Sequence, residues 1–167
     1  MNKLVAAGAA TVLVAVGLTG SSATAAPPPP ANAPSATPAV GGILSGPQTA
    51  RQDGISLKVR DDTLVRTFTI TYSAGDFSGW HQHPGIVLAT VEKGVVVQQV
   101  GCQATRRSAG QSFTEVAPHQ VSNPATDTSA AGDAVLRITQ LVPAGETAFR
   151  DEAREPACWR KRPLPTR

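Results

Sequence analysis

Residues 75–94 read GDFSGWHQHPGIVLATVEKG, and residues 110–123 read GQSFTEVAPHQVSN. Together they contain all three histidines of the 167-residue chain: His81, His83 and His119. His81 and His83 are two positions apart, so on a β-strand their rings lie on one face, about 6.6 Å apart along the strand. His119 must come from another strand. Three imidazoles are enough for a metal site, and imidazole suits zinc, copper, iron and nickel.

Glycines frame the histidines in both stretches. The first stretch has Gly75, five residues, His81-x-His83 and then Gly94, and the second has Gly110, eight residues, His119, three residues and Asn123. This spacing resembles the two motifs of the cupin family of small jelly-roll β-barrels, over roughly residues 50 to 143. The resemblance implies that His81, His83 and His119 bind a divalent transition metal (zinc, iron, nickel or copper) and that a small-molecule ligand could bind beside it.

The chain departs from the family pattern at the carboxylate. The family usually places a Glu shortly after the histidine pair as a fourth ligand, whereas Val87 and Leu88 stand at those positions here. Glu92 is no replacement, because it points to the opposite face of the same strand. Glu115 and Asp76 are interpreted as solvated turn residues. The prediction is therefore a three-histidine site that leaves the full double charge of its ion uncompensated.

The second motif also departs from the family pattern, because it lacks the Pro-x-Gly turn and is two residues shorter before its histidine.

Three hypotheses for function stay open. The chain binds a divalent metal without a specified activity, or it is a metal-dependent small-molecule enzyme such as a dioxygenase, or it is a metal-free barrel with a decayed site. Fold analogy does not choose among them.

Short β-branched and aromatic runs separated by turn residues predict an all-β sandwich or barrel. The resemblance to the cupin family implies that this fold is a single cupin-type β-barrel (double-stranded jelly roll). Glu92-Lys93-Gly94 is predicted to be a hairpin loop and 73–76 a second turn. Along one strand Phe68, Ile70 and Tyr72 share a face, with threonines on the other. The predicted strands are Ile55–Val59, Leu64–Tyr72, Ile86–Val91, Val95–Val100, Ser112–Val116 and Ala134–Val142.

The chain divides into four predicted regions. Residues 1–25 have a basic start, an apolar run and an Ala-x-Ala end, as in a secretory signal peptide. Residues 26–48 form a Pro/Ala-rich segment predicted to be an extended linker. Residues 49–145 form the barrel, and residues 146–167 a basic C-terminal tail, interpreted as solvated. We therefore expect a secreted or extracytoplasmic protein without a membrane span in the mature chain.

The net charge limits the kinds of binding partner, and the cysteine content predicts a disulfide. The formal charge of +3 falls to +2 when the signal peptide, which carries only Lys3, is removed. This is too small to indicate a nucleic-acid partner. Nothing in the sequence indicates an oligomeric state. Two cysteines in an exported chain predict one disulfide, Cys102–Cys158, which by the chain-entropy model stabilises the folded state by about 4 kcal/mol at most. The alternative, a pair of thiol metal ligands, lacks the C-x-x-C spacing of zinc sites.

Export can be checked directly. Mass spectrometry of the exported protein should find an N-terminus near Ala26, because Ala23 and Ala25 form the cleavage pattern and a cut one residue later would put Pro27 first. Exported material that still begins at Met1 would contradict the prediction.

Overall fold

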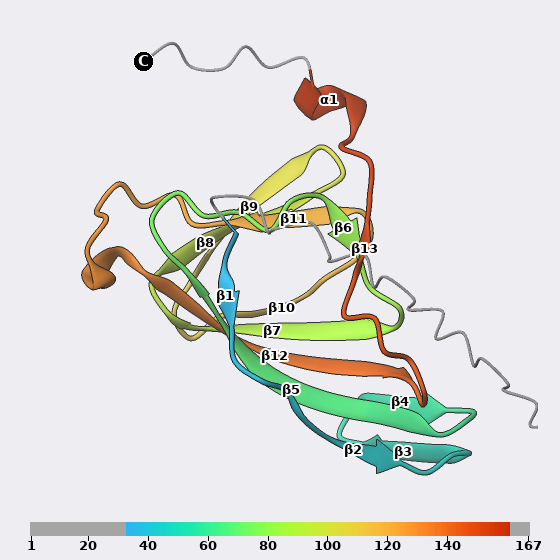
Figure 1. Cartoon of the computed structure of the whole chain (residues 1–167). Helices are drawn as coiled ribbons and strands as arrows, with labels where there is room; N and C mark the ends of the chain where they lie inside the picture. Colours follow the sequence, from blue (N-terminus) through green and yellow to red (C-terminus); the bar gives the residue numbers. More distant parts are fainter. Residues whose placement is uncertain (1–32, 161–167) are drawn as a thin grey trace, which may run out of the picture.

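The structure, a computed structural model, describes residues 33–160. Two antiparallel sheets face each other across the core (Figure 1). The first has the order β1-β5-β12-β7-β10, and β2 also pairs with β5. Its strands are β1 (Ser35–Ala36), β2 (Val40–Leu44), β5 (Thr63–Tyr72), β7 (Ile86–Lys93), β10 (Ser112–Thr114) and β12 (Ala134–Pro143).

The second sheet has the order β13-β6-β11-β8-β9. A separate hairpin pairs β3 with β4, and the described chain has two short helices, η1 (Ala130–Gly132) and α1 (Ala157–Arg160). None of its helices is long and apolar enough to cross a membrane. The remaining strands are β3 (Gln48–Gln52), β4 (Ile55–Val59), β6 (His81–Gln82), β8 (Val95–Val100), β9 (Gln103–Ser108), β11 (His119–Ser122) and β13 (Asp151–Glu152).

From β5 onward the chain passes repeatedly between the two sheets. It runs from β5 to β6, back to β7, across to β8, and later from β10 to β11, β12 and β13. This alternation closes the sheets into a jelly-roll-like barrel, which confirms the predicted fold class. All six predicted strands are present, with ends shifted by at most two residues.

The turn at Gly94 differs from its prediction as a hairpin loop. β7 and β8 belong to different sheets, so the turn is a corner between sheets. Gly94 has φ of 73°, and a Cβ there would lie 2.7 Å from the carbonyl oxygen of Asp133. Glycine is needed for both reasons. The second predicted turn is confirmed, since the amide of Asp76 donates to the carbonyl of Ser73.

Side chains on the inner face of the first sheet form the core. Along β12 every second residue is buried, from Ala134 to Val142, as a half-buried strand requires. On β5 the face of Phe68 and Tyr72 points inward. The core therefore consists mainly of Phe68, Tyr72, Val87, Ala89, Val91, Val96, Phe113, Val121, Ala134, Leu136 and Ile138.

The core becomes polar toward one end of these strands. Beyond Phe68 and Ile138, the next inward residues are Arg66 on β5 and Gln140 on β12, which are directly opposite each other in the sheet. Arg66 Nε donates to Gln140 Oε1 over 2.7 Å, so the buried amide and guanidinium satisfy each other. This polar end of the barrel holds the histidines.

The predicted linker is wrong for residues 35–44, where β1 and β2 pair with β5; residues 26–32 lie outside the described part of the chain. Composition favoured a linker because the segment buries little apolar surface, and Val40 is indeed 78% exposed. Backbone hydrogen bonds to a sheet edge hold it instead. β13 likewise belongs to the second sheet, although Asp151 and Glu152 themselves are exposed.

The predicted disulfide is present. Cys102, in the turn after β8, is bonded to Cys158 in α1, with their Cα atoms 5.9 Å apart. The bond fixes the C-terminal segment beside the second sheet.

Candidate metal centre

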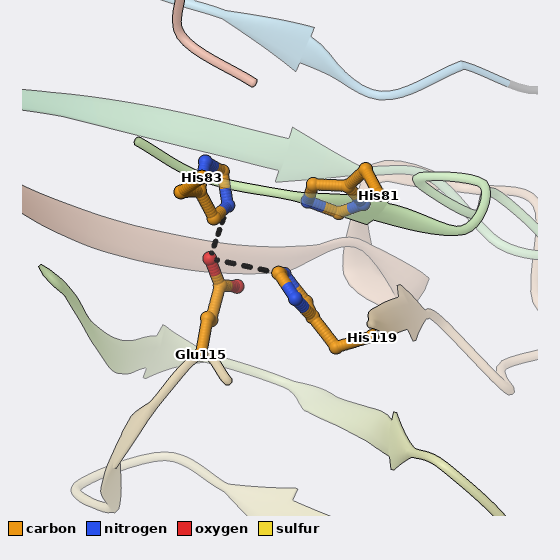
Figure 2. Close-up of side chains that lie close together, drawn as sticks. All are labelled: His81, His83, Glu115 and His119. Carbon is orange, nitrogen blue, oxygen red and sulfur yellow. Dashed lines mark ion pairs between the residues drawn. The ribbon is translucent and has the colours of Figure 1, made fainter. Parts of the chain in front are cut away.

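The three histidines converge inside the barrel (Figure 2). β6 carries His81, and His83 follows two residues later, so both rings reach the interior as predicted from their spacing. β11 begins at His119, which pairs directly with His81 across the two strands. The ring centroids lie 4.1 Å apart for His81 and His119, 4.8 Å for His81 and His83, and 5.1 Å for His83 and His119.

Glu115 joins them, and its interpretation as a solvated turn residue is wrong. Its side chain is 6% exposed, and Oε2 lies 2.9 Å from His83 Nε2 and 3.4 Å from His119 Nε2 (Figure 2). The ligand atoms of the four residues all lie within 4.8 Å of one another. A metal here would have part of its charge cancelled by the carboxylate, contrary to the three-histidine prediction.

The backbone explains how Glu115 reaches the site. β10 pairs with β7, and just beyond its end the amide of Glu115 donates to the carbonyl of Val87 over 3.1 Å. Val87 is the position where the family pattern expects a carboxylate. The acid therefore enters the cavity from the strand beside Val87. The only signal in the sequence is a Glu four residues before a histidine, which does not by itself predict a ligand. The register of β10 with β7 is what brings this Glu into the site.

The other acids that the sequence analysis considered stay away from the site. Glu92 pairs with Arg137 at the surface of the barrel. Asp76 accepts a hydrogen bond from the amide of Ser73 and stabilises the turn at 73–76. Both outcomes agree with the predictions for these two residues.

Backbone carbonyls orient two of the imidazoles. His81 Nδ1 lies 2.8 Å from the carbonyl oxygen of Gly79, and His83 Nδ1 lies 2.6 Å from that of Phe149. A carbonyl oxygen only accepts, so each Nδ1 carries the proton and donates. Nε2 of a neutral ring then keeps its lone pair. A carbonyl partner of this kind fixes the tautomer of a metal-binding histidine and raises the basicity of the nitrogen that binds.

Three other ring nitrogens lack hydrogen-bond partners among the described residues. Nε2 of His83 and both ring nitrogens of His119 are buried and make no hydrogen bond within the described chain. Glu115 Oε2 is close to the two Nε2 atoms, but these contacts do not have hydrogen-bond geometry. A lone pair on His83 Nε2 facing a carboxylate oxygen 2.9 Å away is repulsive unless a positive charge lies between them. Buried polar atoms are rarely left this way, so the site fits a bound cation.

The charge states suit metal binding. Burial lowers the pKa of His81, and the neighbouring His119 lowers it further, to about 4. His81 is therefore neutral near pH 7, as a ligand must be. Burial by itself raises the pKa of Glu115, but the adjacent imidazoles of His119 and His83, when protonated, lower it to about 2. The carboxylate is therefore ionised.

A cavity of about 740 Å³ opens beside the cluster. Its walls are largely apolar, with aromatic and aliphatic side chains of β5 and β12 on one side and the segment around β1 on another. His81, His83 and Glu115 lie at its polar end, together with the amide of Gln140. The apolar walls come mainly from Phe68, Ile70, Tyr72, Ile138, Phe149 and the Ala and Pro residues of 33–39.

The carboxylate can be tested by moving it. Glu115→Gln should weaken zinc binding about 10-fold or more, because the buried charge that offsets the ion is lost. The double variant Val87→Glu/Glu115→Val, which places a carboxylate on the neighbouring strand, should recover most of the affinity, whereas Glu92→Gln at the surface should not change it. Dissociation constants measured against a chromophoric chelator check both. Unchanged affinity in Glu115→Gln would show that the carboxylate is not a ligand.

No protein-family model matches the sequence, and no curated protein matches it. Among solved structures, the Cupin_2 domain of an XRE-family transcriptional regulator from Enterobacter cloacae is 14% identical, covering 47% of this chain and 80% of its own, with a TM-score of 0.38. A Cupin 2 conserved barrel domain protein from Salinispora arenicola is 17% identical, covering 48% and 64%, with a TM-score of 0.41. A cupin superfamily protein from Desulfitobacterium hafniense is 11% identical, covering 63% and 78%, with a TM-score of 0.39.

These likenesses are distant, and the fold stands on the chain's own features. Its strands alternate between two facing sheets, and the histidines of both predicted motifs meet between them. The chain has a jelly-roll-like barrel of two facing sheets, the fold that its two motifs predict.

Proposed function

We propose that this chain binds a divalent transition metal through His81, His83, Glu115 and His119 and holds a small organic anion beside it. One observation carries the proposal: buried nitrogens without hydrogen-bond partners converge with the buried carboxylate of Glu115 around one point. Three imidazoles and one carboxylate suit zinc, iron, nickel or copper. When bound, such an ion supplies Lewis acidity. The side chains hold it, and the carbonyls of Gly79 and Phe149 orient two of them.

The decayed-site hypothesis fits these contacts less well. Remnant histidines have no reason to remain facing a buried carboxylate, because burying an ionised group without compensation is costly. The fold does not need this cluster, since the apolar core lies elsewhere on β5 and β12. The favoured reading is therefore an intact site.

An anion is the favoured ligand because the site has excess positive charge. A divalent ion with one carboxylate and three neutral imidazoles carries a net charge of +1. Buried Arg66 donates to Gln140, which lines the cavity, although Glu146 offsets part of the Arg66 charge. Arg150 at the cavity is paired with Glu152. The apolar walls select a hydrophobic body for this ligand, and the volume of about 740 Å³ lies in the usual range for small-molecule sites.

Catalysis is the second candidate. A six-coordinate ion held by four protein ligands keeps two positions for other molecules, which is the requirement for a metal-dependent small-molecule enzyme such as a dioxygenase. The cavity beside the cluster favours this candidate, since it gives a substrate access to the ion. Binding of metal and anion is common to both candidates. We also propose export of the chain, which the Cys102–Cys158 disulfide supports.

Metal content tests the first half of the proposal. Untagged protein exposed in turn to zinc, iron, nickel and copper should retain about one ion per chain with at least one of them. His81→Ala and His119→Ala should each abolish retention, because each removes a ligand, while Gln120→Ala next to His119 should not. Elemental analysis after gel filtration measures this. Wild-type protein without stoichiometric metal in all four cases would overturn the proposed function.

Anion binding tests the second half. Benzoate should bind the metal-loaded protein more tightly than neutral benzamide, and more tightly than acetate, because the site is positive and its walls are apolar. Ile70→Glu should weaken benzoate binding much more than Ile70→Gln, which has the same size without charge. Both variants should keep their metal. Titration calorimetry gives the affinities, and equal binding of benzoate and benzamide would contradict the proposal.

A further inference from the structure

The histidine pair lies on a strand of only two residues. β6 contains His81 and Gln82, and it lies between β11 and β13 in the second sheet. Its register with β11 consists of the single pair His119 and His81. Such a short strand has little pairing of its own, so its position depends on both neighbours.

The neighbour on the other side is the segment 148–159, called here the tail segment. Within it, β13 pairs with β6 through Asp151 opposite Gln82 and Glu152 opposite His81. The amide of Ala153 continues the pairing by donating to the carbonyl of Trp80 over 2.9 Å. The tail segment therefore provides most of the pairing that holds the histidine strand.

The tail segment also makes the contact that orients His83. Its Phe149 carbonyl accepts the hydrogen bond from His83 Nδ1 over 2.6 Å and another from Gln140 Nε2 over 3.1 Å. The Phe149 ring stacks on the guanidinium of Arg66 at 3.8 Å and meets Phe68 edge to face. These contacts fix the carbonyl that sets the tautomer of a proposed ligand.

The disulfide anchors the far end of this segment. Cys158 is bonded to Cys102, and Trp159 Nε1 donates to the carbonyl of Gly101 over 2.6 Å. Cys102 lies two residues after Val100, the last residue of β8, and Val100 pairs with His119. The bond therefore connects the strand beside His119 with the segment that supports His81 and His83.

We propose that the tail segment is part of the metal site: it positions His81 and His83, and the Cys102–Cys158 bond sets the metal affinity by holding it in place. This inference rests on the proposed function. In these terms Phe149 is a positioning residue through its carbonyl, and the disulfide couples the site to the redox state of its surroundings.

Two variants test the inference by different routes. Cys102→Ser/Cys158→Ser removes the anchor, and Ala153→Pro keeps the disulfide but removes the amide that donates to Trp80. Serine variants are preferred to a thiol reductant, because thiols bind these metals themselves. Each variant should weaken zinc binding about 10- to 100-fold, the range for losing contacts that orient a metal ligand.

The control separates positioning from stability. Val91→Ala removes a buried side chain from the apolar part of the core, away from the cluster, and should lower the thermal midpoint without changing zinc affinity below that midpoint. The absorption spectrum of the cobalt-loaded protein, which reports ligand geometry, should change in the two tail variants and not in Val91→Ala. Unchanged zinc affinity and cobalt spectra in both tail variants would overturn the inference.

A measurement without metal distinguishes this inference from the proposed function. In metal-free wild type, the Nδ1 proton of His83 should exchange slowly with water in ¹H–¹⁵N spectra, because it is bonded to the Phe149 carbonyl. In both tail variants it should exchange quickly. If wild type binds no metal, the proposed function fails, and slow exchange in the variants would then refute the positioning role as well.

Discussion

The antiparallel pairing of β5 with β12 is the constraint on which the rest of the structure depends. Ten consecutive residue pairs join these strands, from Ala134 opposite Tyr72 to Pro143 opposite Thr63. Because side chains alternate between the two faces of a strand, this one register decides every inward residue on both. It stacks apolar side chains at one end and brings Arg66 against Gln140 at the other. If β12 slipped by one residue against β5, all of the inward side chains of β12 would point outward.

The polar end of the barrel buries the groups that are electrostatically unfavourable for folding. An ionised carboxylate and three imidazoles lie together out of water, and three of the ring nitrogens make no hydrogen bond within the described chain. Isolated buried charges and unpartnered polar atoms are unfavourable. A divalent cation would turn these repulsive and unpaired contacts into favourable ones. The same arrangement that costs stability without an ion therefore provides its binding affinity.

The support of this cluster comes from both ends of the barrel sequence. β1 contributes to the cavity wall, and the tail segment supplies the Phe149 carbonyl and the pairing of β13 with β6. Neither region has the side-chain pattern of a buried strand. β1 is held by backbone pairing with β5, and the tail segment by pairing with β6, by the side chains of Phe149 and Trp159, and by the disulfide. Residues outside the two histidine motifs, at both ends of the barrel sequence, therefore contribute to the site.

The sequence by itself determined the all-β class, the main strands, the pairing of its two cysteines and the three histidines of the site. Alternation, turn residues and motif spacing are local properties that can be read from the order of the residues. It could not determine the role of Glu115. That residue acts in the site only because β10 pairs with β7 in a register that puts it beside Val87. Nor could it place residues 35–44 or the tail segment, whose stability comes from backbone pairing with distant strands. Hydrogen bonds between distant backbone groups leave little trace in side-chain patterns, so only the tertiary structure decided these features.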